Sequence, residues 1–173
     1  MGDCLTVAAV EGEGDTDLLL VVAADLEAVR APSDVGAFDS DLTIVALGLM
    51  VHRALEAAKT LAEEGIDSEV VDLRTLVPLD REGVARSVRK TGRLVVADED
   101  YRSYGVTAEI IASVVEAGIP LEGPPRRVAY PDIPVPFTPP MERFALPDAR
   151  RIAQAARDAM EGKVSGVGAG SWP

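Results

Sequence analysis

Hydrophobic residues in the middle of the chain alternate between the pattern of a buried strand and that of an amphipathic helix. Residues 42–47 form a continuous apolar, β-branched run, which is typical of a strand buried on both faces. After Gly48, apolar residues recur at helical spacing as far as Gly65, which is well placed to end the helix. A second apolar run covers residues 68–73. This stretch therefore predicts one strand–helix–strand unit.

The alternation continues along the chain, with polar caps and glycines between the elements. Asp80 is an N-cap candidate, and Thr91-Gly92 and Gly118 are helix stops. Alternating strands and helices with short links predict an α/β fold, a three-layer, mostly parallel sheet with helices on both faces. The further helices are expected at 80–90, 106–117 and 148–161, and the further strands at 93–97 and 127–129.

A proline-rich segment, residues 131–140, interrupts this pattern. Proline lacks the amide proton and fixes φ, so the segment is expected to be neither a central strand nor a helix. Its composition resembles a polyproline ligand. Its position between a strand and the last helix favours a rigid crossing segment instead.

The two ends of the chain differ from its middle. Residues 1–40 hold nine acids and one base, and residues 18–31 read either as a strand running into a short helix or as part of a poorly ordered arm. The predicted organisation is an acidic extension at 1–40, a domain at 41–162 and a flexible tail at 163–173.

The net charge limits the kinds of partner that the chain is expected to bind, and the cysteine count indicates the cellular compartment. The formal net charge of −12 argues against nucleic acid or an anionic membrane surface as a partner. A lone cysteine excludes an internal disulfide and fits a reducing cytoplasm. No secretory signal is seen, and the apolar run 18–24 is too short to cross a bilayer. The expected localisation is therefore cytoplasmic.

Ligands of parallel α/β folds sit at the carboxyl ends of the strands, so the candidates come from there. Gly48 precedes a helix and either presents amides to an anion or serves only as a turn residue. His52, the sole histidine, is read as a ligand for phosphate or carboxylate, as an interface proton donor, or as a partly buried, hydrogen-bonded residue. Neither a zinc ligand set nor a nucleophilic triad is supported.

Asp98, Glu99 and Asp100 form the strongest local concentration of charge, directly before Tyr101. Three carboxylates are able to hold Mg²⁺ with several waters. Alternatively, they cap the next segment or pair with Arg102, or they form a contact surface for a partner domain. A phosphoacceptor domain would use an acid at this position, but it also needs an acidic pair after the first strand, which this chain lacks there. Capping or pairing and a contact surface are therefore the favoured interpretations.

Several long motifs together resemble the C-terminal domain of transketolase-like thiamine enzymes. The resemblance is greatest to the β subunit of the E1 component of 2-oxo acid dehydrogenases of the pyruvate or acetoin type. The motifs are DLTIVALGLMVHRALEAAKTLAEEGI (41–66), VVDLRTLVPLD (70–80), VRKTGRLVVADEDYRSYGVTAEI (88–110) and YPDIPVPFTPPMERFALPDARRI (130–152).

The resemblance implies a parallel-rich sheet with one antiparallel strand, in an oxidoreductase that uses thiamine diphosphate and Mg²⁺. The domains that bind this cofactor in the family are not found in the sequence, so no cofactor is expected to be bound by this chain alone and no catalytic residue is assigned. The resemblance implies three kinds of partner. The chain would form a homodimer, associate with an E1 α-like subunit, or both, and it would offer a docking surface to the acyltransferase (E2). Gly48 and His52 match family positions beside the substrate channel or dimer contact.

Three hypotheses follow. The first is an assembly and docking domain of an E1 β-like subunit, supporting thiamine-dependent oxidative decarboxylation of a pyruvate-like 2-oxo acid. The second is a stand-alone, non-catalytic interaction or regulatory module with the same fold. The third is a small enzyme that uses the strand-end acids with Mg²⁺.

Overall fold

The computed structural model describes residues 20–22 and 40–163, which hold five strands and five helices. The strands are β1 (Leu20–Val22), β2 (Leu42–Ala46), β3 (Ser68–Asp72), β4 (Leu94–Tyr101) and β5 (Arg126–Tyr130). The helices are α1 (Leu49–Glu63), α2 (Arg81–Thr91), α3 (Val106–Glu116), α4 (Pro139–Ala145) and α5 (Ala149–Met160).

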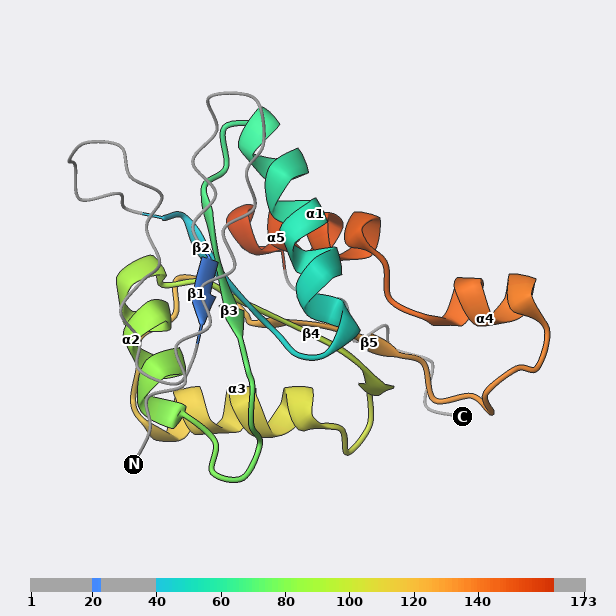
Figure 1. Cartoon of the computed structure of the whole chain (residues 1–173). Coiled ribbons are helices and arrows are strands. Elements are labelled where there is room, and N and C mark those ends of the chain that lie inside the picture. The colour runs from blue at the N-terminus through green and yellow to red at the C-terminus, as the bar shows by residue number, and fades with distance from the viewer. Residues whose placement is uncertain (1–19, 23–39, 164–173) are drawn as a thin grey trace.

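The strands form one sheet in the order β1-β3-β2-β4-β5, and every pairing between them is parallel. Helices α1 and α5 cover one face of the sheet, and α2 and α3 cover the other (Figure 1). The expected three-layer α/β architecture is thus confirmed. The antiparallel strand that the family resemblance implies is not among the strands of the described part.

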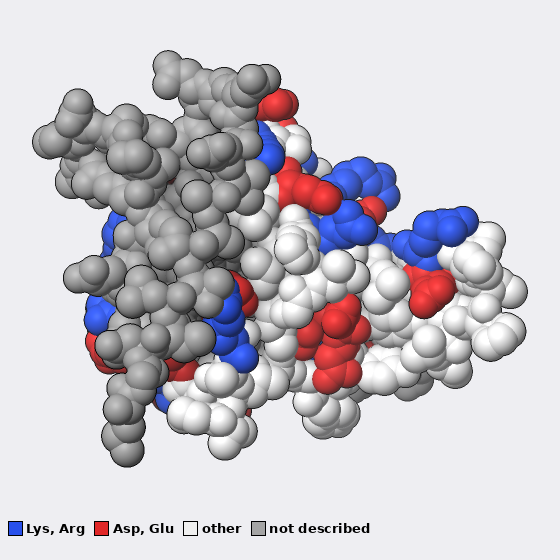
Figure 2. Space-filling view, viewed as in Figure 1, with Lys and Arg blue, Asp and Glu red and all other residues white. Residues whose placement is uncertain are grey.

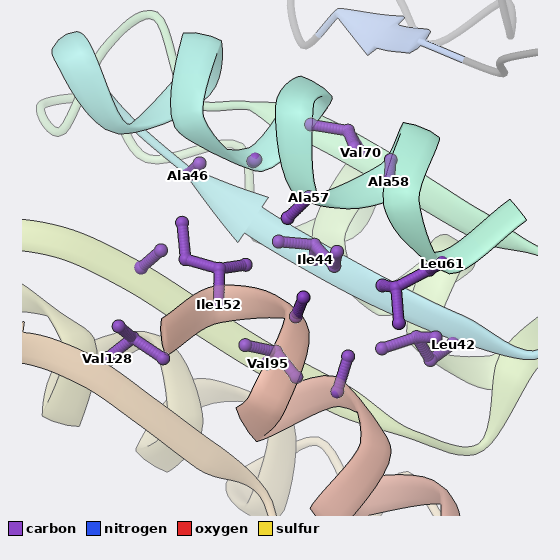
Figure 3. Close-up of a cluster of buried hydrophobic side chains, with 14 of the residues drawn as sticks. Leu42, Ile44, Ala46, Ala57, Ala58, Leu61, Val70, Val95, Val128 and Ile152 are labelled. Atoms are coloured by element: carbon purple, nitrogen blue, oxygen red, sulfur yellow. The ribbon is translucent and has the colours of Figure 1, made fainter. Parts of the chain in front are cut away.

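Strand β2 lies at the centre of the sheet and its five residues are all buried. On one face, Leu42, Ile44 and Ala46 pack against α1 and α5, as Figure 3 shows. On the other, Val45 packs with residues of α2 and α3. Alternate side chains of a strand point to opposite faces, so a continuous apolar run is what a strand between two helical layers requires.

A buried hydroxyl cluster joins β2 to α2. Thr43 Oγ1 lies 2.7 Å from Ser87 Oγ and 2.8 Å from Thr91 Oγ1, and Thr91 Oγ1 also donates to the Arg93 carbonyl oxygen at 3.1 Å. Buried hydroxyls are costly without partners, so mutual bonding allows three polar residues inside an apolar layer.

Replacing Thr43 by valine is expected to destabilise the fold by about 1–3 kcal/mol, because Ser87 and Thr91 lose their shared partner. Urea unfolding followed by circular dichroism measures this loss. The matched control is Thr60→Val on the exposed side of α1, for which a change below about 0.5 kcal/mol is expected. Equal losses in the two variants would contradict the role given to the cluster.

The structure extends the sequence prediction at three places. Strand β4 runs on to Tyr101 instead of ending at residue 97, because pairing with β5 resumes at Tyr101 and Tyr130 after an irregularity. The last prolines of segment 131–140 begin α4, since proline is tolerated at the first helical positions. In the acidic extension, Leu20–Val22 forms β1 beside β3. The rest of the extension up to residue 39, and the predicted tail from residue 164 on, lie outside the described residues.

Candidate functional site

The carboxyl ends of the parallel strands lie at one edge of the sheet, called here the carboxyl edge. It consists of segments 47–49, 73–80 and 131–133, which follow β2, β3 and β5, and of segment 99–105, which contains the end of β4 and the loop after it. Gly48 forms the turn after β2 with φ +56°, a backbone conformation that favours glycine. A Cβ atom at Gly48 would lie 3.4 Å from Glu99 Oε1. The structure therefore brings the β2–α1 turn and the end of β4 together.

His52 lies on the first turn of α1 and is exposed. In the described part of the chain it makes no hydrogen bond to another side chain. The interpretation of a partly buried, hydrogen-bonded histidine is therefore wrong. An exposed imidazole at the carboxyl edge stays available for contact with another molecule.

The three acids lie near the end of β4, where the pairing with β5 is irregular, and they differ in burial. Asp98 is buried, with 4% of its surface exposed, whereas Glu99 and Asp100 are exposed. Burial raises the pKa of the Asp98 carboxyl, and hydrogen bonds from the backbone amides of residues 100 and 99 partly oppose this rise. Asp98 thus belongs to the sheet, and only Glu99 and Asp100 face solvent.

The structure supports a local backbone contact of Asp100 but not the ion pair with Arg102 that the sequence suggests. Asp100 Oδ1 accepts a hydrogen bond from the backbone N–H of Tyr101 at 2.7 Å, whereas the expected ion pair with Arg102 does not form among the described residues. Arg102 is instead held through its backbone, since its N–H donates to the carbonyl oxygen of Tyr130 at 2.7 Å.

Two tyrosines that are far apart in the sequence meet at this edge. The rings of Tyr101 and Tyr130 lie edge to face, with centroids 5.5 Å apart and planes at 88°. Tyr130 is buried, its hydroxyl has no hydrogen-bond partner within the described part, and burial raises its pKa. Sequence analysis missed Tyr130, because only the pairing of β4 with β5 brings it to Tyr101.

A further contact missed from the sequence ties the β4–α3 loop to the segment after β5. Asp132 accepts hydrogen bonds from Ser103, from the backbone N–H at 3.1 Å and from Oγ at 2.7 Å. These bonds lower the pKa of the Asp132 carboxyl. In the same loop, a Cβ atom at Gly105 would lie 2.1 Å from the Tyr101 carbonyl oxygen, so the tight turn requires glycine.

No group of three or more His, Cys, Asp or Glu residues in the described ranges 20–22 and 40–163 is arranged to hold a metal ion. The exposed charged groups of the carboxyl edge are of both signs: Glu99, Asp100 and Asp132 are acidic, and Arg74 and Arg102 are basic. Exposed aromatic and aliphatic side chains lie in the same segments, and the exposed His52 follows on α1. This arrangement offers a surface for contact, with apolar side chains and charges of both signs.

A model of the family described as "Transketolase, C-terminal domain" matches residues 35–152. The chain belongs to this family. Over 123 residues it is 50% identical to the acetoin:2,6-dichlorophenolindophenol oxidoreductase subunit beta of Cupriavidus necator, covering 70% of this chain and 36% of that protein. Over 120 residues it is 48% identical to the mitochondrial pyruvate dehydrogenase E1 component subunit beta-1 of Arabidopsis thaliana, covering 69% and 33%.

Among solved structures, the family domain resembles a chain described as "Split gene transketolase, inactive beta4 tetramer". The TM-score is 0.62 and the identity 36%, over 72% of this chain and 40% of that one. The chain spans only about a third of the length of the curated relatives above. What it shares with E1 β-like subunits of 2-oxo acid dehydrogenases is their C-terminal domain. No helix among the described residues is long and apolar enough to cross a membrane.

The opposite pKa shifts of Asp98 and Asp132 predict opposite pH dependence. A raised pKa in the folded state means that Asp98 favours folding when protonated, and that this contribution is lost as the pH rises through its folded pKa. Asp98→Asn is therefore expected to stabilise the fold at neutral pH and to lose this advantage as the pH falls below the pKa. Urea unfolding across pH 3.5–7.5 measures the difference.

Asp132→Asn is the matched control with the opposite sign. A lowered pKa means that Asp132 stabilises the fold as an anion, above its unfolded pKa, and that this contribution is lost as the pH falls through the folded pKa. The variant should be less stable than wild type at neutral pH and approach it in acid. Parallel pH profiles for the two variants would contradict both assignments.

Proposed function

We propose that this chain supplies the assembly and docking domain of an E1 β-like subunit in a thiamine-dependent 2-oxo acid dehydrogenase. The observation that carries the proposal is the match to E1 β subunits, which falls on their transketolase C-terminal domain at 48–50% identity. The supported reaction is oxidative decarboxylation of a pyruvate-like 2-oxo acid. The lone cysteine supports a cytoplasmic location.

Thiamine diphosphate and its Mg²⁺ do not fit the residues described here. The described part offers no group of three metal-ligating side chains, and the exposed carboxylates of Glu99 and Asp100 would repel a diphosphate. In this proposal the cofactor is bound by other domains of the assembly, and this domain supplies the surface through which they are held.

The carboxyl edge provides a surface suited to such contacts. Large hydrophobic side chains are exposed there, among them Leu49 at 45%, Leu76 at 44% and Val77 at 92%. Leu76 and Val77 are neighbours in the chain, and adjacent exposed apolar side chains are typical of interaction surfaces. The expected partners are an E1 α-like subunit, a second copy of the chain, and the acyltransferase core.

A stand-alone, non-catalytic interaction module is the alternative, and the same exposed edge favours it. The solved relative described as an inactive β4 tetramer supports assembly of a similar chain without activity. The two functions differ in whether an α-like subunit is a partner.

A capture experiment separates the two functions. The full chain should bind the E1 α-like subunit of the same organism, and Val77→Lys should weaken the capture because it places a charge in the apolar edge. Val115→Lys, at a side chain 58% exposed on α3, is the matched control and should bind like wild type.

The pure chain is expected to give no turnover with thiamine diphosphate, Mg²⁺, pyruvate and a dye as electron acceptor. Turnover by the chain alone would contradict the assembly role. Absence of any α-subunit capture would instead favour the stand-alone module.

A further inference from the structure

Residues 131–147, called here the strap, leave the body of the domain between β5 and α5 and include α4 (Figure 1). Figure 2 shows this part of the surface as a largely uncharged projection. Helix α4 packs extensively against no other helix or strand of the described part. The strap exposes five large hydrophobic side chains: Ile133, Val135, Phe137, Met141 and Phe144. Its position therefore depends mainly on how its two ends are held.

The end of the strap next to α5 is held by several contacts of Arg151. The guanidinium donates to the carbonyl oxygens of Phe144, Ala145 and Leu146 at 2.5, 3.3 and 3.4 Å, respectively. It also lies over the Phe144 ring, 5.7 Å from the ring centroid, which is favourable for a cation. Ala145 is fully buried. This end is therefore firmly attached to the domain.

The end next to β5 is held by one pair of residues, Ser103 and Asp132, called here the clasp. Both hydrogen bonds of the clasp are donated by Ser103 to the Asp132 carboxylate, and both residues are exposed. Among the described residues, no other hydrogen bond or ion pair joins segment 131–143 to the rest of the domain. Loss of the clasp would therefore release this end of the strap.

The clasp also holds a strained backbone. Ser103 immediately precedes Tyr104, whose φ of +63° lies in the left-handed region, which is unfavourable for a residue with a Cβ atom. Tyr104 is the only non-glycine residue with a positive φ in the ranges 20–22 and 40–163. Its ring is fully exposed, so no packing of the side chain offsets the strain. The bonds from Ser103 are thus formed together with an unfavourable conformation of the next residue.

A second unfavourable feature lies beside the strap. The hydroxyl of Tyr130, at the end of β5, is buried and lacks a hydrogen-bond partner in the described part. Burial, Tyr101 and the charge of Glu142 on α4 raise the pKa of this hydroxyl, so α4 lies close to it. A buried hydroxyl without a partner is costly. Movement of the strap away from Tyr130 would allow water to bind there.

Prolines make the strap stiff. Between the clasp and the Arg151 anchor lie Pro134, Pro136, Pro139 and Pro140. Proline fixes φ, so this stretch has few backbone conformations. A stiff segment that is released at one end moves as a unit instead of fraying residue by residue. The strap is therefore suited to take two distinct positions.

We propose that the clasp and Tyr104 form a two-state device that controls the position of the strap. In the closed state, Asp132 is bound by Ser103, the strap is held against the domain, and Tyr104 keeps its left-handed conformation. In the open state, the clasp is broken, the strap moves away and Tyr104 relaxes. A molecule that binds the open state better than the closed one shifts the population towards the open state.

The inference goes beyond the proposed function, because it concerns the isolated chain and requires no partner. It links two exposed apolar features, the strap and the Tyr104 ring, through one pair of hydrogen bonds. Contact of another molecule with one of these features would therefore change the other.

Pulsed electron paramagnetic resonance on the full chain measures the position of the strap. One spin label is attached at Met141→Cys on α4 and the other at Lys59→Cys, exposed on α1, with Cys4→Ser removing the native thiol. The chain with an intact clasp is expected to give one dominant distance. Ser103→Ala should add a second distance and raise the open-to-closed ratio about tenfold or more, because a hydrogen bond to a charged group is lost. Asp132→Ala, which removes both bonds, should raise it further.

Tyr104 distinguishes a two-state device from a simple tether. In the Ser103→Ala background, Tyr104→Gly is expected to lower the ratio at least about threefold, because glycine adopts a positive φ without strain. Tyr104→Ala is the matched control: it also removes the ring but keeps the strained Cβ atom, so the ratio should not change. As a second control, Ser113→Ala removes a hydroxyl that accepts from Arg81 on the α2–α3 face, and it should leave one dominant distance.

A single distance in both Ser103→Ala and Asp132→Ala overturns the inference, because the clasp then does not hold the strap. Equal ratios for Tyr104→Gly and Tyr104→Ala also overturn it, since the strain then has no part in the equilibrium. The labelled chain is measured without a partner. Failed capture of the α-like subunit therefore leaves this result untouched, and a single distance leaves the proposed function untouched.

Discussion

Burial of β2 on both faces is the constraint on which the rest of the structure depends. Leu42, Ile44 and Ala46 pack into the α1–α5 layer, while Val45 packs into the α2–α3 layer. A strand that is buried on both faces requires a layer of helices on each side of the sheet, and this requirement fixes where the helices pack. Exposed large hydrophobic side chains are therefore found at the carboxyl edge and on segment 131–147, where the chain leaves the layers.

Much of this arrangement could be predicted from the sequence, because local periodicity determines it. The apolar run before Gly48 and the Asp80 cap define elements through contacts between near neighbours in the chain, and the structure confirms them: Asp80 Oδ1 accepts from the Gly83 N–H at 2.8 Å. The buried hydroxyl cluster was not foreseen, since Thr43 and Ser87 meet only when α2 packs on the sheet.

The candidate site could be predicted only in part. The sequence reveals Asp98, Glu99 and Asp100 because they are three consecutive acids. Which of them is buried depends on how far β4 continues. That length is set by pairing with β5, which a single sequence does not show. Similarly, the Arg151 guanidinium donates to the carbonyl oxygen of Phe144, which lies seven residues earlier in the chain, so no short motif reveals this contact. Long-range pairing accounts for each of these differences.

Strand β1 has a consequence for the boundary of the domain. Leu20–Val22 pairs with β3, although it lies outside residues 35–152, the part that matches the family. An unpaired strand at the edge of a sheet presents a row of free N–H and C=O groups, which is a template for strand addition and aggregation. Residues 20–22 shield that side of β3. A chain truncated to residues 35–152 would keep most of the core but expose the edge of β3 to strand addition. The family match alone therefore does not reveal that this short strand protects the sheet.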